Sequence, residues 1–185
     1  MHSALLIIDI QNDYFPGGKM ELEGAERAAA EAATLLSCFR QNGAEVIHIQ
    51  HVATKAGASF FLPDSDGVAI HAAVLPAKNE TVMVKHFPNS FRDTGLHEHL
   101  QRLGVSRLVV AGMMTHMCVD TTVRAAADLG YAVTLAQEAC ATRALSFCGV
   151  AVAASEVQAA YLAALDGSFA SVKSVREIAA AQPGP

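Results

Sequence analysis

Residues 107–136 read RLVVAGMMTHMCVDTTVRAAADLGYAVTLA, and this stretch decides the fold that we predict for the chain. An aliphatic run at Arg107–Ala111 is followed by a glycine-containing turn, a helical pattern at Met117–Leu129 and a second aliphatic run at Ala132–Ala136. Short aliphatic runs predict strands, and the apolar spacing between them predicts a helix. Gly130 stands where that helix should end, which is typical of a residue that tolerates the left-handed conformation. The stretch is therefore predicted to form one strand–helix–strand unit.

The same alternation extends over the rest of the chain. It predicts further strands at Ala4–Ile10, Glu45–Gln50, Thr81–Lys85 and Phe169–Val172, and further helices at Glu26–Gln41, Asp93–Arg102, Ala144–Leu165 and Val175–Ala180. Strands that are separated by helices, without tight hairpin turns, pair in parallel through right-handed crossovers. We therefore predict a single domain over residues 1–185, an α/β fold of Rossmann-like type: a three-layer α/β/α sandwich with a mostly parallel six-stranded sheet. Only Val52–Asn79 lacks a clear strand or long helix, and a loop of that length predicts a lid, a binding loop or a subunit contact.

Composition excludes several classes of protein. With 13 Lys and Arg against 18 Asp and Glu the net charge is −5, so nucleic acid or an anionic membrane is not an expected partner. At 52% hydrophobic residues the chain can bury a large core, yet apolar runs such as Leu5–Ile8 are far shorter than the roughly 18 residues that cross a bilayer. The start does not resemble a signal peptide, and the four cysteines form no CxxC pair, so we predict a cytoplasmic protein without a disulfide framework.

Three polar residues stand at strand ends, which is where open parallel sheets bind ligands. Asp9 lies near the end of the first strand, Lys85 closes Thr81–Lys85, and Cys118 follows Arg107–Ala111 through the turn. A carboxylate, an ammonium and a thiol are the parts of an activated nucleophile. A helix N-terminus and a nearby lysine favour the thiolate, while the carboxylate can take the thiol proton. The backbone N–H groups of Met114 and Cys118 are candidates to hold a developing oxyanion.

Each of these residues also has an ordinary structural interpretation. An acid at a strand end is often a cap, a lysine there is usually solvated, and free cysteine is among the most buried residue types. The three together are more specific than any one of them. The remaining cysteines lie within or beside predicted helices, where we interpret them as packing residues: Cys38, Cys140 and Cys148.

Three motifs carry a resemblance to a known family: LLIIDIQNDYFPGG at residues 5–18, VMVKHFPNSF at 82–91 and VVAGMMTHMCVDTTVRAAADLGY at 109–131. With EACAT at 138–142, they resemble the isochorismatase-like superfamily of cysteine hydrolases, which includes nicotinamidases and N-carbamoylsarcosine amidases. The resemblance implies an isochorismatase-like fold and a homo-oligomer, a dimer or tetramer. It implies that Asp9 is the acid/base, that Lys85 supports it electrostatically and that Cys118 is the nucleophile. It also implies a non-proline cis peptide at Met113–Met114, in a turn that Thr115 helps to fix.

The chain departs from the nicotinamidase pattern at the metal site. Nicotinamidases of this superfamily hold a divalent metal through an Asp-x-His pair and two further histidines after the second strand. This chain has His48 and His51, then no histidine until His71, and no carboxylate at ligand spacing. Three histidines can in principle bind zinc, but isolated histidines in a loop are more often hydrogen-bonding groups. We therefore predict neither a metal nor another cofactor.

The predicted function is that of a cysteine hydrolase, an amidohydrolase that cleaves a C–N bond of a small amide, lactam or carbamoyl substrate through a thioester. Isochorismatases cleave a vinyl ether with an acid and no thiol, so the presence of Cys118 favours amide chemistry. The alternatives are a vinyl-ether hydrolase that uses Asp9 as its acid, a non-catalytic binding protein on the same scaffold and a redox-sensing thiol. The expected partner is a small-molecule substrate, and eight residues near the three motifs are predicted to contact it: Gln11, Tyr14, Phe61, Phe87, Asn89, Phe91, Thr115 and His116.

Overall fold

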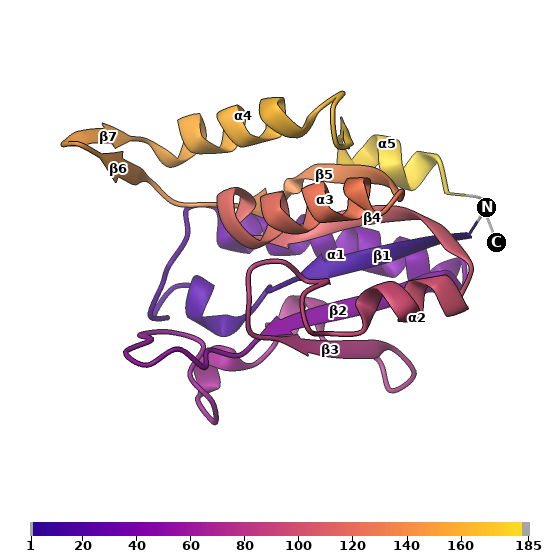
Figure 1. Ribbon diagram of the computed structural model, residues 1–185, viewed down its shortest axis with the longest axis horizontal. Coiled ribbons are helices and arrows are strands. Elements are labelled where there is room, and N and C mark those ends of the chain that lie inside the picture. The colour runs from indigo at the N-terminus through magenta and orange to yellow at the C-terminus, as the bar shows by residue number, and fades with distance from the viewer. Residues whose placement is uncertain (1, 183–185) are drawn as a thin grey trace.

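Six parallel strands form the central sheet, in the spatial order β3-β2-β1-β4-β5-β8 (Figure 1). The computed structural model describes residues 2–182. The strands are β1 (His2–Ile8), β2 (Glu45–His51), β3 (Thr81–Lys85), β4 (Val105–Met113), β5 (Ala132–Ala141) and β8 (Ser171–Lys173). All five pairings between them are parallel, which confirms the predicted α/β fold with its six-stranded sheet.

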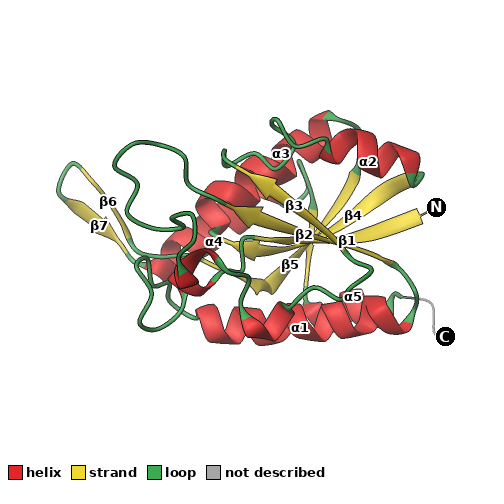
Figure 2. Ribbon diagram, turned by 90° about the horizontal axis from the view of Figure 1, so that it is seen from below, coloured by secondary structure: helices red, strands yellow, loops and turns green. Residues whose placement is uncertain are grey.

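Helices cover both faces of this sheet, with α1 (Ala25–Gln41) and α5 (Val175–Ala180) on one side and α2 (Leu96–Arg102) and α3 (Asp120–Asp128) on the other (Figure 2). β1 is buried on both faces: Leu5 and Ile7 belong to the core under α1, and Leu6 and Ile8 to the core under α2 and α3. A strand covered on both sides needs apolar residues at every position, which explains its uninterrupted aliphatic run. The first polar residue after that run stands at the carboxyl edge of the sheet.

One predicted helix is wrong in its first half. Residues 144–153 form a hairpin of β6 (Leu145–Phe147) and β7 (Val150–Val152), and α4 covers only Ala154–Leu165. The turn residues Cys148 and Gly149 both have positive φ, 50° and 80°, as two-residue hairpin turns require. The apolar residues of this segment were read as a helical pattern, but a glycine followed by β-branched valines favours a hairpin. Consequently Cys148 lies exposed at the tip instead of packing. Cys140 is buried in β5, as expected of a packing residue.

The last strand begins two residues later than predicted, at Ser171 instead of Phe169. The N–H groups of Phe169 and Ala170 both donate to the carbonyl of Leu165, so these residues still belong to the turn that ends α4. Only after this turn is the chain free to pair with β5.

The long segment 52–79 contains just two short 3-10 turns, at Asp66–Val68 and Ala72–Val74, as its lack of periodicity predicted. It is fixed over the carboxyl end of β1 by a buried carboxylate, Asp13, whose Oδ2 accepts from the N–H of Phe61 at 2.6 Å. The backbone of His71 donates to Ile10 at 2.9 Å. This loop therefore forms one wall above the strand ends.

Candidate active site

Asp9 and Lys85 form a fully buried ion pair at the carboxyl edge of the sheet. Asp9 directly follows β1 in the left-handed conformation, with φ of 50°, and its N–H donates to the carbonyl of Ile49 at 3.0 Å. Lys85 is the last residue of β3, and its side chain spans the end of β2 to place Nζ 2.7 Å from Asp9 Oδ2. Both side chains are 0% exposed. The two sequence-predicted residues therefore meet, although 76 positions separate them in the chain.

Cys118 reaches the same place through the turn that follows β4. Gly112, with φ of 147°, lies so close to β1 that a Cβ atom there would be 2.2 Å from the carbonyl oxygen of Ile8. One residue further on, the peptide bond between Met113 and Met114 is cis. Residues Thr115–Val119 then form a π-helical turn that continues into α3, and Cys118 is 6% exposed within it.

The nucleophile candidate lies beside the carboxylate. A carboxylate oxygen of Asp9, the sulfur of Cys118 and a ring nitrogen of His51 all lie within 4.8 Å of one another. Oδ1 of Asp9 has no hydrogen-bond partner among the described residues, so it is available to accept a proton. The structure thus brings together all three sequence-predicted residues. It adds His51, for which the sequence suggested only a role as a metal ligand.

Burial decides the protonation state of this cluster. Burial raises the pKa of the Cys118 thiol well above its usual range, the Asp9 carboxylate raises it further, and Lys85 lowers it by less. Burial opposes the charge of Lys85, but Asp9 and Cys118 outweigh it and raise the pKa of the ammonium. Lys85 therefore favours the thiolate, as expected, but burial and Asp9 outweigh it. The resting site contains a neutral thiol, which needs a base when it attacks.

The turn before Cys118 is held by backbone and side-chain hydrogen bonds. The carbonyl of Met114 accepts from the N–H groups of Met117 and Val119 at 3.0 and 3.3 Å. Thr115 is buried and holds this turn, because its hydroxyl bonds to the carbonyl of Ala141 and to Gln158 Oε1. Thr115 therefore fixes the turn through its side chain, and sequence reasoning missed Gln158, which no motif marks.

Two of the predicted substrate contacts surround the cluster. Tyr14 and Phe61 are each 1% exposed, and their rings meet edge to face at 4.7 Å. Burial, together with the charges of Cys118 and Asp9, raises the pKa of the Tyr14 hydroxyl. The ring centroid of Phe61 lies 5.9 Å from that of His51. Gln11 has a different role, because its amide nitrogen donates to the carbonyls of His51 and Val68 and thus leaves no N–H for a ligand.

The residues after Lys85 divide between two places. The Arg92 guanidinium covers the ring of Phe87 at 3.6 Å. Asn89 caps the following backbone, its Oδ1 accepting from the N–H of Phe91 at 2.9 Å. The expectation that Phe91 lines the pocket is not met, since its ring stacks on Tyr131, which precedes β5 at the opposite edge of the sheet. Phe91 packs against the core on that face.

The three histidines weighed as zinc ligands do not converge. His48 bonds to Glu80 Oε2 at 2.9 Å, and the ring of His71 stacks on Phe15. Only His51 lies at the cluster, and there the ammonium of Lys85 lies 2.7 Å from Asp9 Oδ2 and 3.1 Å from His51 Nδ1. A cationic group thus already occupies the space between these ligand atoms, and a second cation would be repelled.

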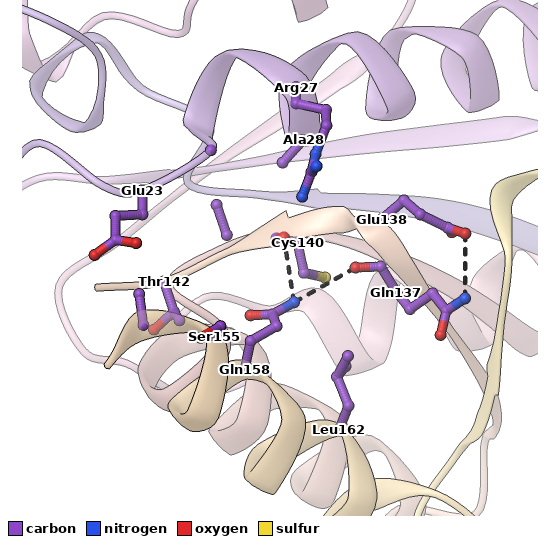
Figure 3. Close-up of a pocket in the computed structure, with 13 residues that line it drawn as sticks. Glu23, Arg27, Ala28, Gln137, Glu138, Cys140, Thr142, Ser155, Gln158 and Leu162 are labelled. Atoms are coloured by element: carbon purple, nitrogen blue, oxygen red, sulfur yellow. Dashed lines mark hydrogen bonds between the residues drawn. The ribbon is translucent and has the colours of Figure 1, made fainter. Parts of the chain in front are cut away.

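A well-formed pocket lies between α1, β5 and α4 (Figure 3), and Cys118 is not among its lining residues. Its volume is about 530 Å³, and it opens between the start of α1, the end of β5 and α4. None of the predicted substrate contacts lines it. Two lining residues bond to the turn: Gln158 to Thr115, and Thr142 to His116 Nδ1 at 2.6 Å. His116 therefore points to this side of the turn.

The parallel α/β sheet, with a thiol, a carboxylate and an ammonium at its carboxyl edge, defines the class of the protein: an α/β sandwich with a buried cysteine-centred site. The family model for the isochorismatase domain matches residues 3–176, and the chain belongs to the isochorismatase family.

Relatives and solved structures agree with this assignment. The chain is 53% identical over 173 residues to the isochorismatase family protein YddQ of Bacillus subtilis, covering 94% of this chain and 96% of that one. It is 36% identical over 139 residues to a streptothricin hydrolase of Streptomyces noursei, covering 75% of this chain and 49% of the relative. The structure of an isochorismatase from Pseudomonas putida is similar with a TM-score of 0.89 at 37% identity, covering 95% and 89% of the two chains. An N-carbamoylsarcosine amidase from Thermoplasma acidophilum, at 21% identity and a TM-score of 0.80, shares the fold over 95% and 97% of the two chains.

Proposed function

We propose that the protein is a cysteine amidohydrolase that cleaves a C–N bond of a small amide, lactam or carbamoyl compound. The observation that carries this proposal is the buried thiol of Cys118 within 4.8 Å of a carboxylate that is itself paired with Lys85. A streptothricin hydrolase among the relatives supports hydrolysis as the reaction type. Cys118 is only 6% exposed, and Tyr14 and Phe61 are each 1% exposed. This enclosure favours a small substrate.

The reaction is proposed to proceed in two steps. In the first, Asp9 takes the proton of the Cys118 thiol as sulfur forms a bond to the carbonyl carbon, and the N–H groups of Met114 and Cys118 hold the oxyanion. The C–N bond then breaks, and Asp9 returns the proton to the departing nitrogen. In the second step Asp9 takes a proton from water, whose oxygen attacks the thioester carbon, and the Cys118 sulfur leaves and regains that proton. The products are a carboxylic or carbamic acid and ammonia or an amine.

Lys85 has an electrostatic role in this scheme. Its ammonium, 2.7 Å from Asp9 Oδ2, balances the charge of the carboxylate at a place where both side chains are fully buried. The carboxylate is therefore ready to receive the thiol proton, and Lys85 does not itself need to transfer one.

The test is a screen of small amides, lactams and carbamoyl compounds for ammonia or amine release, with and without chelator. Cys118→Ala should abolish turnover, and hydroxylamine should trap a hydroxamate only from the wild-type protein with substrate. Thr121→Ala, a half-buried position on α3, is a matched control for substitution in this region. Full turnover by Cys118→Ala would refute the proposal, and sensitivity to chelator would refute the expected absence of a metal.

The two alternatives give different results in the same screen. A vinyl-ether hydrolase that uses Asp9 as its acid would keep its activity in Cys118→Ala and lose it in Asp9→Asn. A binding protein on this scaffold would turn over no compound, but would bind one with a stabilisation that depends on ligand concentration.

We also propose a homo-oligomer and a cytoplasmic location. The hairpin β6–β7 projects from the sheet together with α4 (Figure 1), and Phe147 and Val150 at its end are 80% and 64% exposed. Segment 144–165 contains one charged residue, Glu156, and an isolated apolar hairpin of this kind is only marginally stable in water. Light scattering of wild type against Phe147→Ser tests the oligomer.

The four free cysteines fit a reducing compartment, which cell fractionation tests. In the described chain, no helix combines the length and the apolar character needed to cross a membrane.

A further inference from the structure

His51 ends β2 directly beside the ion pair, and its backbone is held on both sides by one buried amide. Gln11 Nε2 donates to the carbonyl of His51 at 2.9 Å, and Gln11 Oε1 accepts from its N–H at 2.7 Å. In the sheet, His51 pairs with Lys85 on β3. The imidazole is therefore fixed at the place where the lysine side chain crosses from β3 toward Asp9.

The contacts of Lys85 define the tautomer of this imidazole. An ammonium has three N–H groups and no acceptor. Lys85 Nζ lies 2.7 Å from Asp9 Oδ2, 3.1 Å from His51 Nδ1 and 3.1 Å from the carbonyl oxygen of Phe87, and the Cys118 sulfur is a further neighbour. Because Nζ can only donate, Nδ1 must be the unprotonated nitrogen, and the ring proton lies on Nε2.

The charge state of His51 agrees with this assignment. Burial lowers its pKa to about 4, and the neighbouring Lys85 ammonium lowers it as well. The titratable groups that act on the ring are Lys85, Asp9 and His86, with the Cys118 thiol also within 4.8 Å. At neutral pH the imidazole is therefore an uncharged acceptor, which completes the hydrogen bonds of a buried cation.

We propose that His51 is a positioning residue of the active site: its Nδ1 fixes the Lys85 ammonium against Asp9 and thereby orients the carboxylate toward the Cys118 thiol. This proposal rests on the proposed function for its catalytic consequence. Without the imidazole, the buried ammonium loses one of its acceptors and is left with Asp9, the Phe87 carbonyl and the weakly accepting Cys118 sulfur. The ammonium would then turn toward water or the sulfur, and Asp9 would lose its fixed partner.

The first experiment compares His51→Leu with His51→Asn, because the Asn side chain carries an acceptor oxygen near the position of Nδ1 and Leu has none. With an amide found in the screen, kcat of His51→Leu should fall about 100-fold while KM changes less than 3-fold, and His51→Asn should regain at least 10-fold of that loss. His99→Asn on α2 is the control, since it lies outside the site. A rise in KM with unchanged kcat would overturn the proposal, because it would make His51 a substrate contact. Equal losses in the Leu and Asn variants would also overturn it.

A second measurement does not depend on any substrate. The pH dependence of iodoacetamide alkylation of Cys118, followed by peptide mass spectrometry, reports the pKa of the thiol, which Asp9 and Lys85 set. If His51 positions the lysine, this profile shifts in His51→Leu and returns toward wild type in His51→Asn. Identical profiles in all three proteins refute the positioning role. If wild type hydrolyses no amide but the profile shifts as expected, the proposed function fails and the positioning role stands. Circular dichroism verifies that each variant folds. If His51→Leu does not fold, the comparison of His51→Asn with wild type still tests the proposal.

Discussion

The substitution Lys85→Met is the sharpest test of the buried ion pair. It keeps most of the side-chain volume and removes the charge, so Asp9 loses a partner 2.7 Å away in a place where both side chains are 0% exposed. Removing one member of a buried pair costs about 3–5 kcal/mol, because the other charge is left without compensation. The free energy of unfolding of a typical domain is about 5–15 kcal/mol, so the loss is a large part of the total.

Urea unfolding at pH 7, followed by circular dichroism, measures this loss. Lys173→Met, at an exposed position of β8, is the matched control and should stay within about 0.5 kcal/mol of wild type. The double variant Asp9→Asn/Lys85→Met should be more stable than Lys85→Met alone, because no uncompensated charge remains. A loss below about 1 kcal/mol in Lys85→Met would refute the reasoning, as would additive effects of the two substitutions.

Two further perturbations test the surroundings of the site. Gly112→Ala should lower the free energy of unfolding by about 1–3 kcal/mol, as measured by thermal unfolding, and should also reduce activity. The reason is that its Cβ would lie 2.2 Å from the carbonyl oxygen of Ile8 and displace the strand that precedes Asp9. A variant as stable as wild type would contradict this. Glu80→Gln should lower the free energy of unfolding, measured in urea at pH 7, by about 1–3 kcal/mol. The physical reason is the hydrogen bond from Arg40, which lowers the pKa of the Glu80 carboxyl to about 2. That difference should be complete above about pH 4.5, the ordinary pKa, and vanish as the pH falls through 2; a difference independent of pH would contradict it.

Local periodicity was sufficient to predict the sheet. β1 is buried on both faces, so all its positions are apolar and the strand is visible in sequence. The segment 144–153 was wrongly predicted to be helical because it is apolar although most of its residues are exposed. Its alternation is weak and its neighbours in sequence are alanines, so only Gly149 indicated a turn.

The candidate residues were also partly predictable. Asp9 and Lys85 each interrupt or close an aliphatic run, and Cys118 follows a glycine turn, so each is marked by its position at a strand end. His51 was not distinguished from His48, three residues earlier on the same strand. Their different surroundings arise from neighbouring strands and loops, which local sequence does not describe.

The sequence by itself determined the strand–helix alternation, the parallel sheet and the set of polar residues at its carboxyl edge, because these depend on local spacing. Only the tertiary structure decided that the cysteine is a neutral thiol, since its pKa depends on burial and on a carboxylate 109 positions away in the chain. The tertiary structure likewise decided that Phe91 lies at the opposite edge, that Gln11 holds the backbone and that His51 supports Lys85. Protonation and orientation depend on distances between segments remote in sequence, and those distances exist only once the sheet has formed.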